Sequence, residues 1–236
     1  NPFARQFLLG WISVLDSVPQ IEMLPYLPEF LDGLFNMVSD EKPKINTAAK
    51  NTLNAFLQEI KANPSNADIR SLVTIVIPRC TSEGEIETNL IALTWLHCIV
   101  RISVKRDMLI PFVHSILGAV LPSVANDTDE IKELAIKTNT LLEKLINVTD
   151  QEIMFDELLQ QISFQVCSKF VHTRLAALRW AFLLYDKYPQ SLVDNLENLF
   201  AITLTDTSSE VLTLCLDLMA RIGQNEEYFL KLMECI

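Results

Sequence analysis

The sequence predicts an all-α fold built from helical hairpins that stack in a row. Apolar residues recur at i, i+3, i+4 and i+7 through nearly every segment, which is the spacing of an amphipathic helix. Only 5 of the 236 residues are Gly, and regular strand-like alternation is hard to find. A unit of two helices and a polar turn also returns about every forty residues. That period is typical of HEAT and armadillo repeats, so we expect a right-handed α-solenoid.

The repeat is read from the residue that opens each second helix, which is Pro or a β-branched residue. These residues are Pro2, Ile45, Ile86, Ile131, Val171 and Val211. We therefore expect one solenoid over residues 1–236, with a leading helix at 1–18 and a further helix starting in 225–236. The complete repeats are expected at 21–61, 67–104, 107–146, 151–188 and 190–223. Because the chain opens in a second helix without a Met and closes in an apolar stretch, we expect a piece of a longer array.

A polar turn divides each repeat. The turn residues are Asp40, Gly84, Asp127, Ser168 and Asp206. Asp side chains accept hydrogen bonds from the free N–H groups at the start of a helix. We therefore interpret Asp40, Asp127 and Asp206 as helix caps.

The charge balance limits the class of partner. The 30 acidic and 19 basic side chains give a net charge of −11, which disfavours nucleic acid because phosphates are held by clustered Lys and Arg. Arg101, Lys105 and Arg106 form a local exception, and a solvated turn explains them as well as a lipid or phosphate contact does. The five Cys show no Cys-x-x-Cys spacing, which favours a reducing, cytoplasmic compartment.

Residues that carry catalysis or hold metals are sparse. The three histidines, His97, His114 and His172, fall in three different repeats, and no second pair of ligands completes a metal set. The sequence contains no Gly-rich phosphate loop and no His-Glu-x-x-His helix. We therefore predict that the chain is not an enzyme and has no catalytic, cofactor-binding or metal-binding residues.

All three tryptophans occupy the same position of their second helices. Trp11, Trp95 and Trp180 each lie nine residues after the residue that opens the helix. In one interpretation each indole fills space between helices. In the other, the tryptophans anchor a partner protein, together with Ile91 and Ile99, which make their helix apolar nearly all round. The sequence leaves both interpretations open, and these five residues are the candidate partner-binding residues.

Several stretches resemble one known family. They are residues 1–8 with Trp11-Ile12, Tyr26 to Phe35, Phe56 to Lys61 with Asn63 to Ser65, Ile116 to Pro122, and Ala177 to Tyr185. In their order and spacing they resemble a central fragment of the vacuole-morphology scaffold family often called Vac-fourteen. The chain has only a short link at 147–156, where relatives can carry a long insert.

The resemblance implies a function as well as a fold. It implies a non-catalytic HEAT-repeat scaffold that brings together PIKfyve, the kinase making phosphatidylinositol 3,5-bisphosphate, and the opposing phosphoinositide phosphatase. It also implies a cytoplasmic protein at endosomal, lysosomal or vacuolar membranes, held there indirectly, with self-association through regions outside this chain. A nuclear-transport-type or other cargo-binding adaptor is the alternative, and it would carry carboxylates along the second helices.

Overall fold

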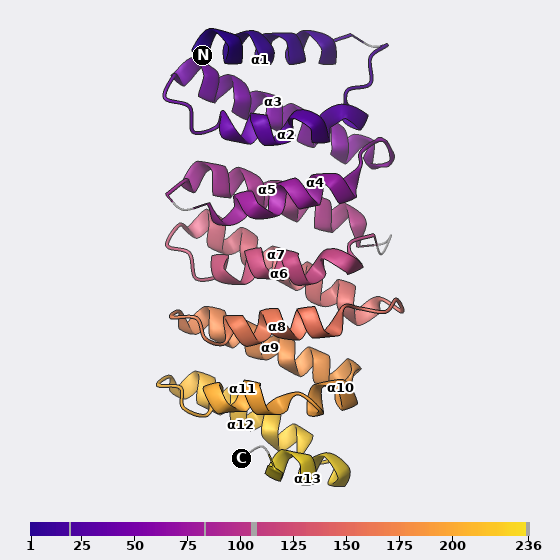
Figure 1. Ribbon diagram of the computed structural model, residues 1–236, viewed down its shortest axis with the longest axis vertical. Coiled ribbons are helices and arrows are strands. Elements are labelled where there is room, and N and C mark those ends of the chain that lie inside the picture. Colours follow the sequence, from indigo (N-terminus) through magenta and orange to yellow (C-terminus); the bar gives the residue numbers. More distant parts are fainter. Residues whose placement is uncertain (19, 83, 105–107, 235–236) are drawn as a thin grey trace. The chain divides into compact units, whose positions relative to one another are not determined.

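The computed structural model describes residues 1–18, 20–82, 84–104 and 108–234, apart from the side chains of residues 197, 198 and 202. Helices make up the secondary structure of these residues, and no strand occurs among them (Figure 1). The all-α prediction is therefore confirmed, and the arrangement is consistent with an α-solenoid. Lys105 and Arg106, two members of the predicted basic turn, lie outside the described residues.

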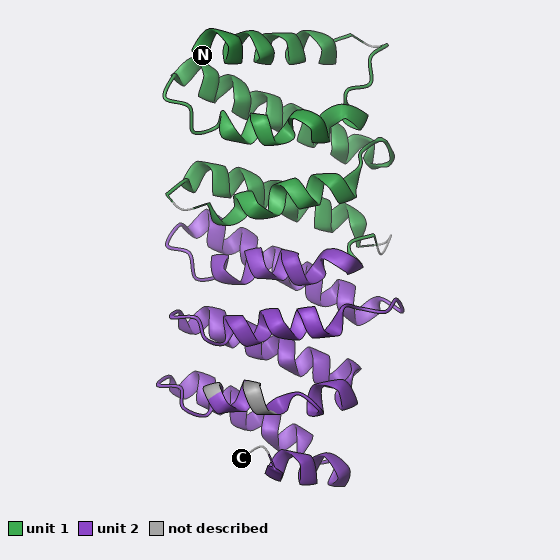
Figure 2. Ribbon diagram, in the orientation of Figure 1, with its two compact units in different colours: residues 1–109 green, residues 110–236 purple. Residues whose placement is uncertain are grey.

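The chain divides into two compact units, residues 1–109 and 110–236 (Figure 2). Unit 1 begins with α1 (Pro2–Asp16). Two hairpins follow. The first contains η1 (Leu24–Tyr26), α2 (Leu27–Asn36) and α3 (Pro43–Ala62), and the second contains η2 (Pro64–Asn66), α4 (Ile69–Val76), η3 (Ile77–Thr81) and α5 (Ile86–Ser103).

Unit 2 contains three hairpins and a final helix. The first hairpin contains η4 (Ile110–Phe112), α6 (Val113–Ser123) and α7 (Asp129–Val148), and the second contains α8 (Phe155–Gln165) and α9 (Val171–Lys187). The third has a first helix in two pieces, α10 (Pro189–Val193) and α11 (Leu196–Thr203), before α12 (Ser209–Ile222). The last helix is α13 (Glu226–Glu234).

Within each unit the helices pack in two layers. In unit 1, α1, α3 and α5 contact one another in succession, while α2 packs on α4 (Figure 1). In unit 2, α7, α9 and α12 form the corresponding row of second helices, and α6 packs on α8. Aliphatic and aromatic side chains from both layers form the core of each unit; examples that are fully buried are Phe35, Phe56, Leu142 and Leu184. Because each hairpin buries its apolar face against its neighbours, packing between hairpins stabilises the helices.

The helix ends follow from local chemistry. The Asn1 side chain accepts from the Phe3 amide at 3.0 Å, and Pro2 begins α1 where a missing N–H costs little. Asp68 accepts from the amide and hydroxyl of Ser71 at the start of α4, and these bonds lower the pKa of its carboxyl. Gly84 takes a φ of +75° in the turn before α5, a conformation that favours glycine.

Two features predicted from the sequence stay predictions. These are the continuity of one solenoid over residues 1–236 and the right-handed, HEAT-type turn of the hairpins. Among the described residues, none of the helices combines the length and hydropathy needed to cross a membrane.

Candidate partner-binding site

The structure places the five candidate partner-binding residues in different environments. Trp95 on α5 and Trp180 on α9 are 1% and 0% exposed, whereas Trp11 on α1 is 50% exposed. Ile99 is fully buried and Ile91 is half-buried. The burial of Trp95, Trp180 and Ile99 favours the packing interpretation for these three residues. Trp11 and Ile91 remain accessible to a partner.

Packing around Trp180 includes a polar partner. Its Nε1–H donates to Asn139 Oδ1 on α7 at 2.8 Å, and the Asn139 amide donates to Glu143 Oε1 at 2.7 Å. Burial raises the pKa of the Glu143 carboxyl, while the Asn139 hydrogen bond and the charge of Arg179 act in the opposite direction. The indole of Trp180 is thus both buried and fully bonded, as is usual for a Trp in a protein interior.

Trp95 occupies the same helix position in unit 1 without such a partner. Its ring packs edge to face on Phe35 of α2, with 6.1 Å between ring centroids. Its Nε1 is buried and has no hydrogen-bond partner among the described residues. The residue of α3 that corresponds to Asn139 is Leu53, because each lies eight residues after the Ile that opens its helix. Leu53 cannot accept a hydrogen bond.

Trp95 and Ile91 line a groove between α3 and α5 with a volume of about 290 Å³. The other lining residues are Lys50, Asn51, Asn54, Leu57 and Thr94. Lys50 forms an ion pair across the groove with Glu87, which lowers the pKa of the Glu87 carboxyl. The groove therefore combines apolar contact area with several hydrogen-bonding side chains, a combination typical of binding sites.

A second accessible surface lies on α1 and is apolar. Its exposed side chains, from 50% to 82%, are Phe3, Phe7, Leu8, Trp11 and Val14. Phe7 and Trp11 contact each other edge to face, with 5.9 Å between ring centroids. Next to this surface, the starts of α1 and α3 enclose a groove of about 620 Å³ that includes Pro2, Phe3, Lys42 and Lys44. Apolar patches of this kind mark interaction surfaces.

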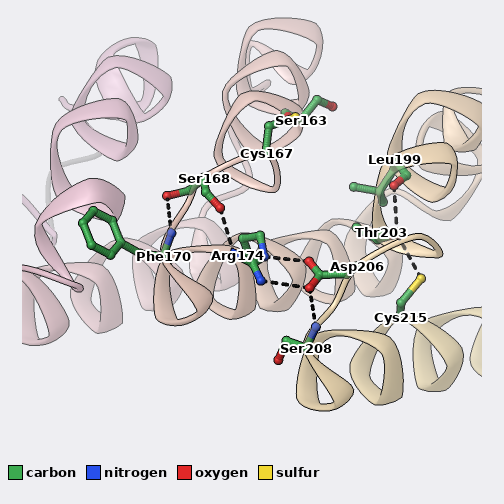
Figure 3. A network of polar contacts seen from close by, with 10 residues as sticks. All are labelled: Ser163, Cys167, Ser168, Phe170, Arg174, Leu199, Thr203, Asp206, Ser208 and Cys215. Carbon is green, nitrogen blue, oxygen red and sulfur yellow. Dashed lines mark hydrogen bonds and ion pairs between the residues drawn. The ribbon is translucent and has the colours of Figure 1, made fainter.

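The turns between helices hold neighbouring hairpins in register. In unit 2, Arg174 of α9 forms two hydrogen bonds with Asp206, Nε to Oδ2 at 2.6 Å and Nη2 to Oδ1 at 2.8 Å (Figure 3). Its Nη1 donates to the Ser168 carbonyl at 2.9 Å. The side chains of Arg174 and Asp206 are 11% and 8% exposed. This buried ion pair ties the α8–α9 turn to the α11–α12 turn.

The predicted cap residues bond the amide that directly precedes each helix, whereas we expected them to bond an amide in its first turn. Asp40 accepts from the amide of Lys42, and Asp206 accepts from that of Ser208, which are the residues immediately before α3 and α12. Each acceptor lies two residues before its donor, as in an Asx turn. At the α6–α7 turn this acceptor is Asn126, which bonds the Thr128 amide at 2.9 Å, so the assignment of this role to Asp127 was wrong.

The titratable side chains of the described residues are spread over separate helices. Among the described residues, no three His, Cys, Asp or Glu side chains gather closely enough to hold a metal ion. Burial raises the pKa values of the Cys80, Cys98 and Cys215 thiols, which leaves them poor nucleophiles. His97, His114 and His172 lie on α5, α6 and α9 respectively.

Comparison with known proteins finds no matching family model but several relatives, among them proteins of three different organisms. The VAC14 homolog of Arabidopsis thaliana is 37% identical over 236 residues, which cover 99% of this chain and 31% of the relative. The VAC14 homolog of Schizosaccharomyces pombe is 48% identical over 61 residues, 26% of this chain and 8% of the relative.

The third relative is the vacuole morphology and inheritance protein 14 of Saccharomyces cerevisiae. It is 20% identical over an alignment of 317 residues, which covers 89% of this chain and 36% of the relative. The chain thus spans about a third of the length of the Arabidopsis and Saccharomyces relatives. The similarity to the Arabidopsis protein runs along nearly all of the chain and includes both compact units.

Proposed function

The chain belongs to the VAC14 family, and we propose that it serves as a non-catalytic scaffold for a phosphatidylinositol 3-phosphate 5-kinase and the opposing phosphoinositide phosphatase. The identity of 37% along 99% of the chain is the observation that carries this proposal. The Saccharomyces relative is named for vacuole morphology and inheritance, which points to a scaffold-type protein associated with the vacuole.

The distribution of accessible surface supports a role in protein interaction. The apolar face of α1 and the α3–α5 groove lie on neighbouring second helices of unit 1, and they differ in chemistry. A scaffold with two distinct surfaces raises the concentration of one bound enzyme near the other without a chemical step of its own. In this proposal it thereby regulates the synthesis of phosphatidylinositol 3,5-bisphosphate.

The proposed location is the cytoplasmic side of vacuolar, lysosomal or endosomal membranes. In this proposal the kinase and the phosphatase bring the scaffold to the membrane, so its attachment is indirect. A contact between Arg101 and anionic lipid stays a prediction, since its neighbours Lys105 and Arg106 lie outside the described residues.

Affinity purification of the full-length protein from cells, followed by identification of the recovered proteins, tests the scaffold. We expect the lipid kinase and the phosphoinositide phosphatase to be recovered together. Ile91→Ser should reduce recovery of one enzyme, because Ile91 is half-buried in the α3–α5 groove, and thermal unfolding of the variant separates lost binding from lost stability. Thr140→Ala, on the exposed side of α7, is the matched control. Recovery of nuclear-transport factors without a lipid kinase would instead support a cargo-binding adaptor.

A further inference from the structure

Negative charge is concentrated in unit 2. Residues 110–236 contain 18 acidic and 9 basic side chains, a net charge of −9, whereas residues 1–109 contain 12 acidic and 10 basic side chains, a net charge of −2. A protein surface with an excess of one charge attracts ligands of the opposite charge and repels those of its own sign. Unit 2 therefore favours a cationic partner over nucleic acid or an anionic membrane surface.

A groove between α9 and α12 lies on this unit. The two helices pack against each other, and the groove has a volume of about 360 Å³. Leu175 and Arg179 line it from α9, and Glu210, Leu214 and Asp217 line it from α12. Glu210 and Asp217 are seven residues apart, which places them on one face of α12 about 10 Å apart along the helix axis. Leu214 lies between them on that face, so the groove offers an apolar contact between two carboxylates.

The charged groups of this groove have no ion-pair partner within the chain. Among the residues that the structure describes, the carboxylates of Glu210 and Asp217 form neither an ion pair nor a hydrogen bond. The same holds for the Arg179 guanidinium, whose charge acts on the Glu143 carboxyl of α7 from a distance. Both carboxylates are therefore available to a partner.

We propose that the α9–α12 groove binds a basic segment of a partner protein, whose cationic side chains pair with Glu210 and Asp217. Carboxylates outnumber the guanidinium in the groove two to one, so charge complementarity favours a cationic segment. The Arg179 guanidinium carries only donors, and it donates to a backbone carbonyl of the segment. An apolar side chain between the two cations contacts Leu175 and Leu214. This inference rests on the proposed scaffold function and specifies one contact that the scaffold makes.

The spacing of the two carboxylates sets the spacing of the two cations. An extended chain advances about 3.3 Å per residue, so residues three apart in the segment span about 10 Å. Side chains three apart leave opposite faces of an extended chain, but the flexible four-carbon stem of lysine lets both ammonium groups reach their carboxylates. We therefore expect two lysines three positions apart with an apolar residue between them.

Titration with a synthetic peptide tests the proposal on the whole 236-residue chain. The probe is a rhodamine-labelled nine-residue peptide of glycine and serine that carries two lysines three positions apart and a leucine between them. In one control peptide glutamine replaces both lysines, and in the other serine replaces the leucine. Fluorescence anisotropy is measured near physiological ionic strength, which screens the long-range charge of unit 2. We expect the glutamine peptide to bind at least about fivefold more weakly, and the serine peptide about threefold more weakly.

Substitutions separate the groove from the overall charge of unit 2. Glu210→Gln with Asp217→Asn removes both carboxylates at exposed positions and should weaken binding of the lysine peptide about threefold to tenfold. Asp150→Asn with Glu152→Gln is the matched control, because it removes the same charge from exposed positions outside the groove, and it should change the affinity less than about twofold. Glu210→Lys with Asp217→Lys should instead bind a peptide with glutamates in place of the lysines. If this charge-reversed variant does not fold, the two neutral variants still decide the outcome.

Four results would overturn the proposal. These are no binding of the lysine peptide at about 1 mM, equal affinity for the lysine peptide and either control peptide, equal affinity of the groove variant and its matched control, or a folded charge-reversed variant that does not bind the glutamate peptide. The third result would assign the binding to the overall charge of unit 2. Because the probe is synthetic, its failure to bind leaves the recovery of kinase and phosphatase as a separate test of the scaffold.

Discussion

Removal of the Arg174 guanidinium tests how strongly the ion pair with Asp206 stabilises unit 2. Both side chains are nearly buried, at 11% and 8% exposed, and two hydrogen bonds join them. Arg174→Ala leaves the Asp206 carboxylate with the Ser208 amide as its remaining donor in Figure 3. Breaking a buried pair from one side costs about 3–5 kcal/mol. We expect about 3 kcal/mol, because Asp206 lies in a turn and can move toward water.

The cost should depend on pH in a defined direction. Burial alone would raise the pKa of Asp206, but the hydrogen bonds from Arg174 and Ser208 hold it below its usual value. A carboxylate with a lowered folded-state pKa contributes stability above its unfolded pKa, about 3.9, and loses it as the pH falls through the folded value. The difference in free energy of unfolding between wild type and Arg174→Ala should therefore have its full value at pH 7 and shrink below about pH 4.

Urea unfolding followed by far-ultraviolet circular dichroism measures both quantities. Lys137→Ala is the matched control, because its pair with Glu133 is exposed on both sides and should contribute less than about 0.5 kcal/mol. Arg174→Met with Asp206→Leu should recover most of the lost stability, since both buried charges are removed. A cost below about 1 kcal/mol at pH 7, or one independent of pH, would refute the assigned role of the pair.

Three further predictions test the packing of the second helices by urea or thermal unfolding. Asn139→Leu should cost about 1–3 kcal/mol because it leaves the Trp180 N–H without an acceptor, and an unchanged midpoint would contradict this. Trp95→Phe should cost about 1–2 kcal/mol less than Trp180→Phe, since only Trp180 loses a hydrogen bond; equal costs would count against the unpaired donor. Lys187→Met should lower the free energy of unfolding by about 0.5–1.5 kcal/mol, because the Lys187 ammonium donates to the Ile146 carbonyl near the end of α7. Full stability of this variant would show that the bond contributes nothing.

The helical repeat could be predicted because it depends on the spacing of apolar residues alone. Ile45 and Ile131 opened predicted second helices, and both are buried at the third residue of α3 and α7. Hydrogen bonds in the turns were harder to assign. The acceptor lies two residues before the donor amide, so a shift of one residue in the expected helix start moves the role from Asn126 to Asp127.

The accessibility of each tryptophan could not be predicted from its register. Trp11, Trp95 and Trp180 share one helix position, yet Trp11 is exposed and the other two are buried. Burial depends on which side chains of neighbouring helices cover a position, and a repeat pattern does not report those neighbours. For the same reason, the sequence did not single out Asn139 as the acceptor for Trp180.

The two buried tryptophans show how a repeat protein can keep its fold and still vary the polar contacts in its interior. In unit 2, Asn139 and Glu143 stand where unit 1 has Leu53 and Leu57 at the same helix positions. The polar pair satisfies the indole from inside the protein, while the two leucines leave it unpaired beside a groove. Both arrangements bury a Trp of the same size, so packing alone does not distinguish them. The difference lies in whether a neighbouring helix supplies a hydrogen-bond acceptor, and the missing acceptor costs stability in unit 1.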